Sequence, residues 1–103
     1  MRSIHAPLTL HWEIGNAFSA MFKQHRLSPD QALKALKIYR TIPLQLIDVD
    51  LPKSVQLSST HGLYAYDAYF IVCAQKLSAP LLSLDKGLKS VAVKAGIKLL
   101  EVV

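Results

Sequence analysis

The stretch AYDAYFIVCAQKLSAPLLSLD, residues 65–85, joins a nearly all-apolar segment of helical length to a short apolar run that ends in aspartate. Over residues 65–77 apolar side chains fall on most sides of the expected helix, so this helix should be largely buried. Residues 79–84 form a continuous apolar run of strand length, which is typical of a strand covered on both faces. The stretch therefore predicts a buried helix with Asp67 in its first turn, then a buried strand with Asp85 directly after it.

The rest of the chain predicts short strands that alternate with helices. PLTL, residues 7–10, and LQLIDV, residues 44–49, are expected to be strands, and IKLLEVV, residues 97–103, is a further continuous apolar run. Helices are expected over 11–25, after Ser28 until just before Pro43, from Asp50 to about Thr60, and between Asp85 and Gly96. This order is that of an α/β sandwich with a mainly parallel sheet.

Three of these helix boundaries carry recognisable capping residues. In SPDQ, residues 28–31, Ser28 can cap a helix that has proline at its first position, and Gln31 can bond back to the cap. Asp50 can cap the next helix, and Gly62 is placed to end that helix in a left-handed conformation. These local signals predict helix positions independently of the apolar pattern.

The composition favours one folded domain over residues 1–103, since 51% of the residues are hydrophobic and the length is too short for two independent cores. No apolar run reaches the roughly 18–20 residues of a membrane-spanning helix, so we expect a soluble, cytoplasmic protein. The single cysteine, Cys73, agrees with a reducing compartment and is expected in the core. The formal charge of +5 favours anionic partners such as nucleic acid without identifying one.

Three acids follow strand ends or open helices: Glu13, Asp67 and Asp85. Each alone is explained by favourable interaction with a helix dipole, worth about 0.3–1 kcal/mol. In parallel sheets, however, the strand ends converge, and carboxylates gathered there raise one another's pKa unless a cation neutralises them. Oxygen ligands without a cysteine or histidine cluster select Mg²⁺ or Mn²⁺.

Two stretches resemble a known family. The run YAYDAYFIVCAQKLSAPLLSLDKGLKSVAVKAGIKLLEV, residues 64–102, resembles the C-terminal half of a PIN domain, as found in VapC-type toxins of bacterial toxin–antitoxin pairs. PLTLHWEIGNAF, residues 7–18, is similar to that family's second motif, a glutamate followed three residues later by asparagine. The motifs are short, but they occur in the family's order: E-x-x-N, a D-A pair that opens an apolar helix, and S/T-x-D at a strand end.

The resemblance implies a metal-dependent endoribonuclease of the toxin–antitoxin type, in which a metal-activated water hydrolyses RNA phosphodiester bonds. Glu13, Asp67 and Asp85 would be both catalytic residues and ligands of Mg²⁺ or Mn²⁺. Asn16 and Ser83 would support the site, the serine by orienting the last aspartate. The implied partners are an RNA substrate and a cognate antitoxin protein, and Lys86 and Lys89 are placed to contact RNA phosphates.

The chain departs from the family at its N-terminus. A PIN domain opens with a central strand that carries the first metal-binding aspartate and with a helix, whereas no acid precedes Glu13 here. The resemblance therefore implies a PIN-like three-layer sandwich that is N-terminally truncated and lacks this strand and helix, with unpaired sheet edges that favour a homo-oligomer. The two half-sheets could close on each other, another chain could fill the gap, or Met1 could be a misassigned start.

Two hypotheses follow from this departure. The chain is either an active endoribonuclease or a catalytically inactive truncated PIN domain that acts only as a protein-binding or self-associating module. Asp48 and Asp50 could be proposed as substitute ligands, but they follow a strand expected at the far edge of the sheet. A solvated loop and a helix cap explain these two residues more simply.

Overall fold

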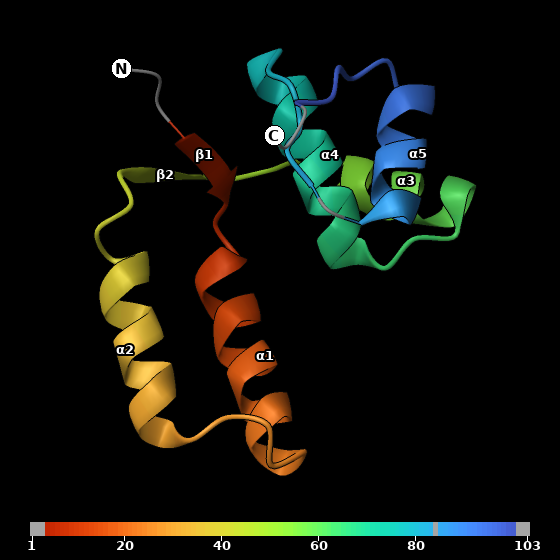
Figure 1. Ribbon diagram of the computed structural model, residues 1–103. Helices are drawn as coiled ribbons and strands as arrows, with labels where there is room; N and C mark the ends of the chain where they lie inside the picture. The colour runs from red at the N-terminus through yellow and green to blue at the C-terminus, as the bar shows by residue number, and fades with distance from the viewer. Residues whose placement is uncertain (1–3, 84, 101–103) are drawn as a thin grey trace. The chain divides into compact units, whose positions relative to one another are not determined.

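The computed structural model describes residues 4–83 and 85–100. Over these residues the chain forms five helices and a two-stranded parallel sheet, which confirms the α/β class (Figure 1). The chain divides into two compact units, unit 1 through Leu46 and unit 2 from Ile47 onward. Among the described residues, no helix combines the length and the apolar character needed to cross a membrane.

Unit 1 contains the strand β1 (Ile4–Pro7), the helices α1 (Leu10–Lys23) and α2 (Pro29–Tyr39), and all but the last residue of β2 (Leu44–Ile47), which pairs with β1. The strand expected within residues 44–49 is confirmed, but the one expected over residues 7–10 is wrong, because β1 ends at Pro7. Thr9 already has helical backbone angles, and its carbonyl accepts a hydrogen bond from the Glu13 amide at 3.0 Å. Residues 8–10, LTL, therefore lead into helix α1 and do not form a strand.

Helices α1 and α2 lie side by side in unit 1 (Figure 1). The Tyr39 hydroxyl and His11 Nδ1 share a hydrogen bond of 2.7 Å, and the two rings meet edge to face with centroids 5.5 Å apart. The expected start of α2 is confirmed: Ser28 Oγ accepts from the Gln31 amide at 3.2 Å, and Gln31 Oε1 accepts from the Ser28 amide at 2.9 Å. This reciprocal pair satisfies two amides that the helix itself leaves without partners.

Unit 2 contains α3 (Leu51–His61), α4 (Ala65–Leu77) and α5 (Lys86–Lys94), and the expected extent of α4 is confirmed. Asp50 Oδ1 accepts from the Lys53 amide at 2.9 Å, so the expected cap of α3 is confirmed. Gly62 ends α3 with φ of +65°, the left-handed conformation that the sequence predicts. Helix α3 packs against α4.

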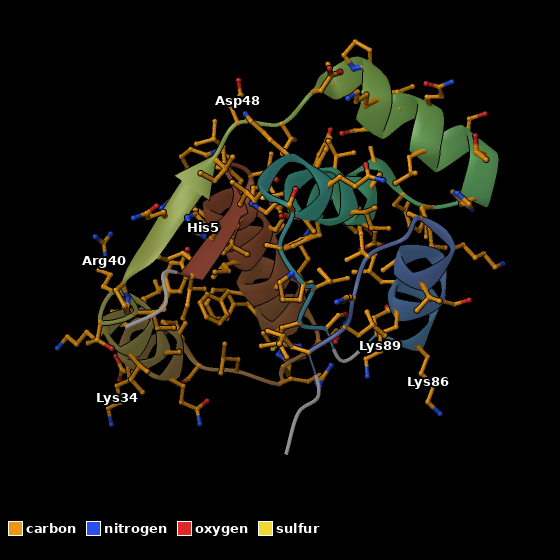
Figure 2. The ribbon with its side chains drawn as sticks, turned by 90° about the horizontal axis from the view of Figure 1, so that it is seen from above. His5, Lys34, Arg40, Asp48, Lys86 and Lys89 are labelled. Carbon is orange, nitrogen blue, oxygen red and sulfur yellow. The ribbon has the colours of Figure 1, made fainter. Side chains whose placement is uncertain are left out.

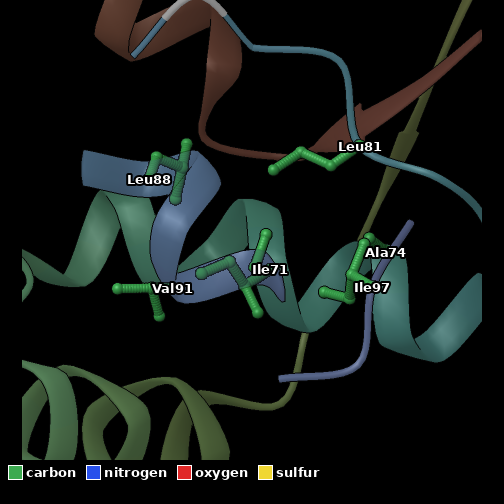
Figure 3. Packing of buried hydrophobic residues seen from close by; sticks show 7 residues of the cluster. Ile71, Ala74, Leu81, Leu88, Val91 and Ile97 are labelled. Atoms are coloured by element: carbon green, nitrogen blue, oxygen red, sulfur yellow. The ribbon is translucent and has the colours of Figure 1, made fainter. Parts of the chain in front are cut away.

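The hydrophobic core of unit 2 lies between α4, α5 and the segments that flank α5 (Figure 3). Its buried members are Ile71, Ala74, Leu81, Leu88, Val91, Ala92 and Ile97. The prediction that α4 is mostly buried is supported by five buried residues, including Cys73. Each fully buried Leu, Ile or Val contributes roughly 1.5–3 kcal/mol, so this core fixes the position of α4 relative to α5.

The apolar runs at 79–84 and 97–103 form less strand than the sequence predicts. Their described parts meet in one isolated parallel bridge, in which the Leu81 amide donates to the Lys98 carbonyl and the Leu100 amide donates to the Leu81 carbonyl, both at 2.8 Å. Residues 84 and 101–103 lie outside the described residues. The buried Leu81 still reaches the core, which explains the apolar pattern without an extended ladder.

Candidate functional site

Asp67 lies in the first turn of α4 and is half buried. The next residue, Ala68, is fully buried and anchors this turn to the interior of unit 2. The Asp67 amide donates to the Tyr64 carbonyl at 3.1 Å, which tightens the start of the helix. The D-A pair therefore combines a packing residue with a carboxylate at the surface of the helix entry.

The pKa of Asp67 is raised, first because burial removes water from its carboxyl group and second because the Asp85 charge acts on it. Two of the acids that the sequence singles out, at the starts of α4 and α5, therefore act on each other electrostatically. Both effects disfavour a second negative charge, and either a proton or a cation relieves them.

Asp85 is the N-cap of α5. Its Oδ1 accepts from the Leu88 amide at 2.9 Å, and its own amide donates to Ser83 Oγ at 3.0 Å. Ser83 thus holds the backbone at Asp85, and the cap holds the carboxylate. Among the described residues, the second oxygen of Asp85 and both oxygens of Asp67 accept no hydrogen bond.

The donor chemistry of the two acids is of the kind that hard divalent cations prefer. Asp67 and Asp85 offer oxygen ligands alone, and a cation between them would offset the repulsion that raises the Asp67 pKa. Within either unit, the described residues contain no group of three His, Cys, Asp or Glu side chains spaced to hold a metal. Among the described residues of unit 2, the candidate ligands are therefore two acids, Asp67 and Asp85.

Glu13 and Asn16 belong to unit 1, on α1. Glu13 lies in the first turn of α1, where Thr9 Oγ1 donates to its Oε2 at 3.2 Å. Asn16 is exposed, and its carbonyl accepts from Ser19 Oγ at 2.9 Å. The E-x-x-N motif therefore places both side chains on the N-terminal half of one helix.

Lys86 and Lys89 lie in the first turns of α5, directly after Asp85, and extend outward from the helix (Figure 2). Lys86 is exposed and Lys89 half buried. Their position beside the two acids places positive charge where a polyanion bound at that pair would carry its phosphates.

The substitute ligands considered for the site have other surroundings. Asp50 caps α3, as expected. Asp48 is exposed (Figure 2). Its carbonyl oxygen accepts a 2.8 Å hydrogen bond from Lys76 Nζ.

Two features near the acids were missed in the sequence. A Cβ added at Gly87 would lie 3.2 Å from Asp85 Oδ1, so glycine leaves room for the capping carboxylate. Tyr64 and Tyr66 form a stacked pair immediately before Asp67. The sequence patterns that could have revealed them are a glycine two residues after the capping Asp85 and two tyrosines separated by one residue.

Comparison with known proteins adds no relative: no protein-family model matches the chain, and the search of curated proteins gives no significant match.

Proposed function

We propose that the chain is an Mg²⁺- or Mn²⁺-dependent endoribonuclease of the toxin–antitoxin type, with a PIN-like three-layer sandwich and a mainly parallel sheet as its finer fold. The observation that carries the proposal is that Asp67 and Asp85 open neighbouring helices of unit 2, where burial and then the Asp85 charge raise the pKa of Asp67. The order of the E-x-x-N, D-A and S-x-D motifs supports it.

In this proposal Asp67 and Asp85 hold the cation, and the PIN-domain resemblance implies Glu13 as a further ligand, with Asn16 as its polar neighbour on α1. A cation held by these residues would lower the pKa of a water and offset charge on the phosphate. The Leu88 amide keeps Asp85 in one orientation. Lys86 and Lys89 offset the charge of the RNA backbone beside the site.

The direct test is cleavage of a labelled RNA by purified protein with added Mn²⁺, comparing wild type with Asp67→Asn and Asp85→Asn. Asparagine keeps the size of each side chain and remains a good N-cap at position 85. We expect each variant to lose at least the roughly 10–100-fold that follows loss of an outer partner of a metal site. Asp30→Asn is the matched control, because Asp30 is also an acid in the first turn of a helix but belongs to α2.

Cleavage that is unchanged in both site variants would show that the activity comes from a contaminant. Cleavage that persists in EDTA would contradict the role of the cation. The Asp30→Asn control should retain wild-type activity, because its carboxylate is lost without touching the proposed ligands.

A second candidate is a catalytically inactive module that binds a cognate antitoxin or a second copy of the chain. The observation that favours it is the exposure of large apolar side chains on the helices of unit 1: Trp12 is 72% exposed, Ile38 68% and Leu33 59%. Helix α1 has no buried residue. This candidate predicts association without any response to Mn²⁺.

A further inference from the structure

Tyr64 and Tyr66 form an exposed aromatic stack at the start of α4. Their ring centroids are 5.5 Å apart and their planes differ by 5°. Tyr64 is 72% exposed and Tyr66 is 48% exposed. Aromatic rings normally contribute to stability by burying large areas, so this pair presents to solvent a surface that the fold of unit 2 does not use.

The polar ends of these side chains give no structural reason for the pair either. Neither hydroxyl hydrogen-bonds to a described residue. Tyr64 is the N-cap of α4, yet its side chain makes no capping bond. The helix start is held instead by the backbone and by the buried Ala68.

The stack and Asp67 belong to the same helix start. Tyr64 is the N-cap of α4 and Asp67 lies in its first turn directly after Tyr66, while Lys86 directly follows Asp85, the N-cap of α5. An aromatic surface beside groups that can hold a cation and a phosphate matches the two parts of a nucleotide. Every base has a π-face, and stacking on an aromatic side chain selects unpaired bases with little regard to sequence.

We propose that Tyr64 and Tyr66 are a stacking platform for an unpaired base of single-stranded RNA, next to the phosphate that faces Asp67 and Asp85. This inference deepens the nuclease proposal and rests on it for the identity of the phosphate. The two rings already contact each other, so the base stacks on an outer face of the pair. The mutual contact holds the platform in place before RNA binds, which reduces the ordering cost of binding.

The test is binding, measured without cleavage. Fluorescence anisotropy of a labelled single-stranded RNA of about 12 nucleotides is recorded in EDTA at low salt, with wild type and with Tyr64→Ala, Tyr66→Ala and the double variant. Base stacking is worth about 1–3 kcal/mol by alanine substitution, so we expect the dissociation constant of the double variant to rise about 5- to 100-fold. Thermal unfolding should change little, because both rings are exposed.

Two matched variants separate stacking from other roles of tyrosine. Tyr64→Phe with Tyr66→Phe keeps both rings and removes both hydroxyls, so binding should stay near that of wild type. Tyr64→Leu with Tyr66→Leu keeps apolar bulk without a ring, so binding should fall with the alanine variants. Wild-type binding by the leucine variant would overturn the proposal.

The RNA is varied in the same way. A duplex of the same sequence, or a strand with abasic sites, should bind more weakly and should no longer distinguish wild type from the alanine variant. Single-stranded DNA should show the same tyrosine dependence, because stacking uses the base face alone. A tyrosine effect of equal size on duplex RNA would overturn base stacking.

The failure of this inference and the failure of the nuclease proposal are distinguishable. Repeating the titrations in an Asp67→Asn, Asp85→Asn background removes both the repulsion of phosphate and the proposed ligands. Tyrosine-dependent binding, together with no RNA cleavage by the wild-type chain in Mn²⁺, would reject the nuclease and support the platform. Cleavage with tyrosine-independent binding would do the reverse.

Discussion

Folding disfavours the ionised form of Asp67. The start of α4 offers a favourable helix dipole, yet burial and the Asp85 charge outweigh it and raise the Asp67 pKa. A core residue at this position would serve stability better. An acid at this position fits a group whose charge serves binding rather than folding.

The raised pKa makes stability depend on pH in a definite direction. The folded chain holds the Asp67 proton more tightly than the unfolded chain, so stability falls as pH rises from about 3.9, the ordinary aspartate value, through the raised folded value. In EDTA at pH 7 we expect Asp67→Asn to be more stable than wild type in urea denaturation. The difference in free energy of unfolding between the variant and wild type should shrink as pH falls toward 4. A variant less stable than wild type at pH 7 would contradict the raised pKa of Asp67.

Added Mn²⁺ should make wild type more stable than Asp67→Asn, the reverse of the order expected in EDTA. A cation that binds only the folded state adds about 2.7 kcal/mol at 100 times its dissociation constant. We expect wild type to gain stability with rising Mn²⁺ and Asp67→Asn to gain less, and Asp30→Asn to respond as wild type does. A response of equal size in wild type and Asp67→Asn would place the bound cation elsewhere.

At the scale of elements, two glycines test how backbone conformation stabilises the helices. Gly62 ends α3 with φ of +65°, and nothing lies within 4 Å of an added Cβ. Gly15 lies inside α1, and its Cβ would also meet nothing within 4 Å. The two sites therefore differ in backbone conformation and not in available space.

The same substitution should consequently have opposite effects. We expect Gly62→Ala to lower the free energy of unfolding by about 1–2 kcal/mol, because alanine is strained in the left-handed region. Gly15→Ala should raise it by roughly 0.5–1 kcal/mol, because alanine is the better helix former. Chemical denaturation with circular dichroism measures both changes, and Gly62→Asn should recover part of the loss. Equal effects of the same sign would contradict this account.

These elements also show how far the sequence could predict the fold. Helix ends were predictable because Ser28, Asp50 and Gly62 act through local chemistry within three residues of the boundary. Strands were less predictable because a strand forms only when its backbone hydrogen-bonds to a neighbouring strand, and the local sequence does not specify that neighbour. Pro7 ends β1 where a strand was expected to begin, and Leu81 makes one bridge where a longer strand was expected.

The candidate site was also only partly predictable from the sequence. The sequence predicted that Asp67 and Asp85 open successive helices of the C-terminal half, and these two acids interact in unit 2. The tyrosine stack was not predictable, because side-chain orientation at a helix entry depends on tertiary packing. Ser83 was expected to orient Asp85, and its hydroxyl accepts from the Asp85 amide.

At the scale of the whole molecule, apolar exposure is the feature that requires an explanation. Large apolar side chains are exposed in both units, including Trp12 on α1, Ile38 on α2 and Leu82 near Asp85, each at least 60% exposed. Single exposed apolar residues are normal on soluble proteins, whereas several on adjacent helices favour association. This exposure supports the homo-oligomer proposed above.

We expect the chain to run above its monomer mass of 11.4 kDa in light scattering coupled to size exclusion, and to dissociate on dilution. Trp12→Lys with Ile38→Lys should raise the dimer dissociation constant at least about 100-fold, because two central apolar contacts are lost and two charges are placed at the interface. Lys37→Glu is the matched control, since it changes a charge on α2 without removing apolar surface. A wild-type chain that stays monomeric at 100-fold different concentrations would contradict self-association and leave an antitoxin as the partner for this surface.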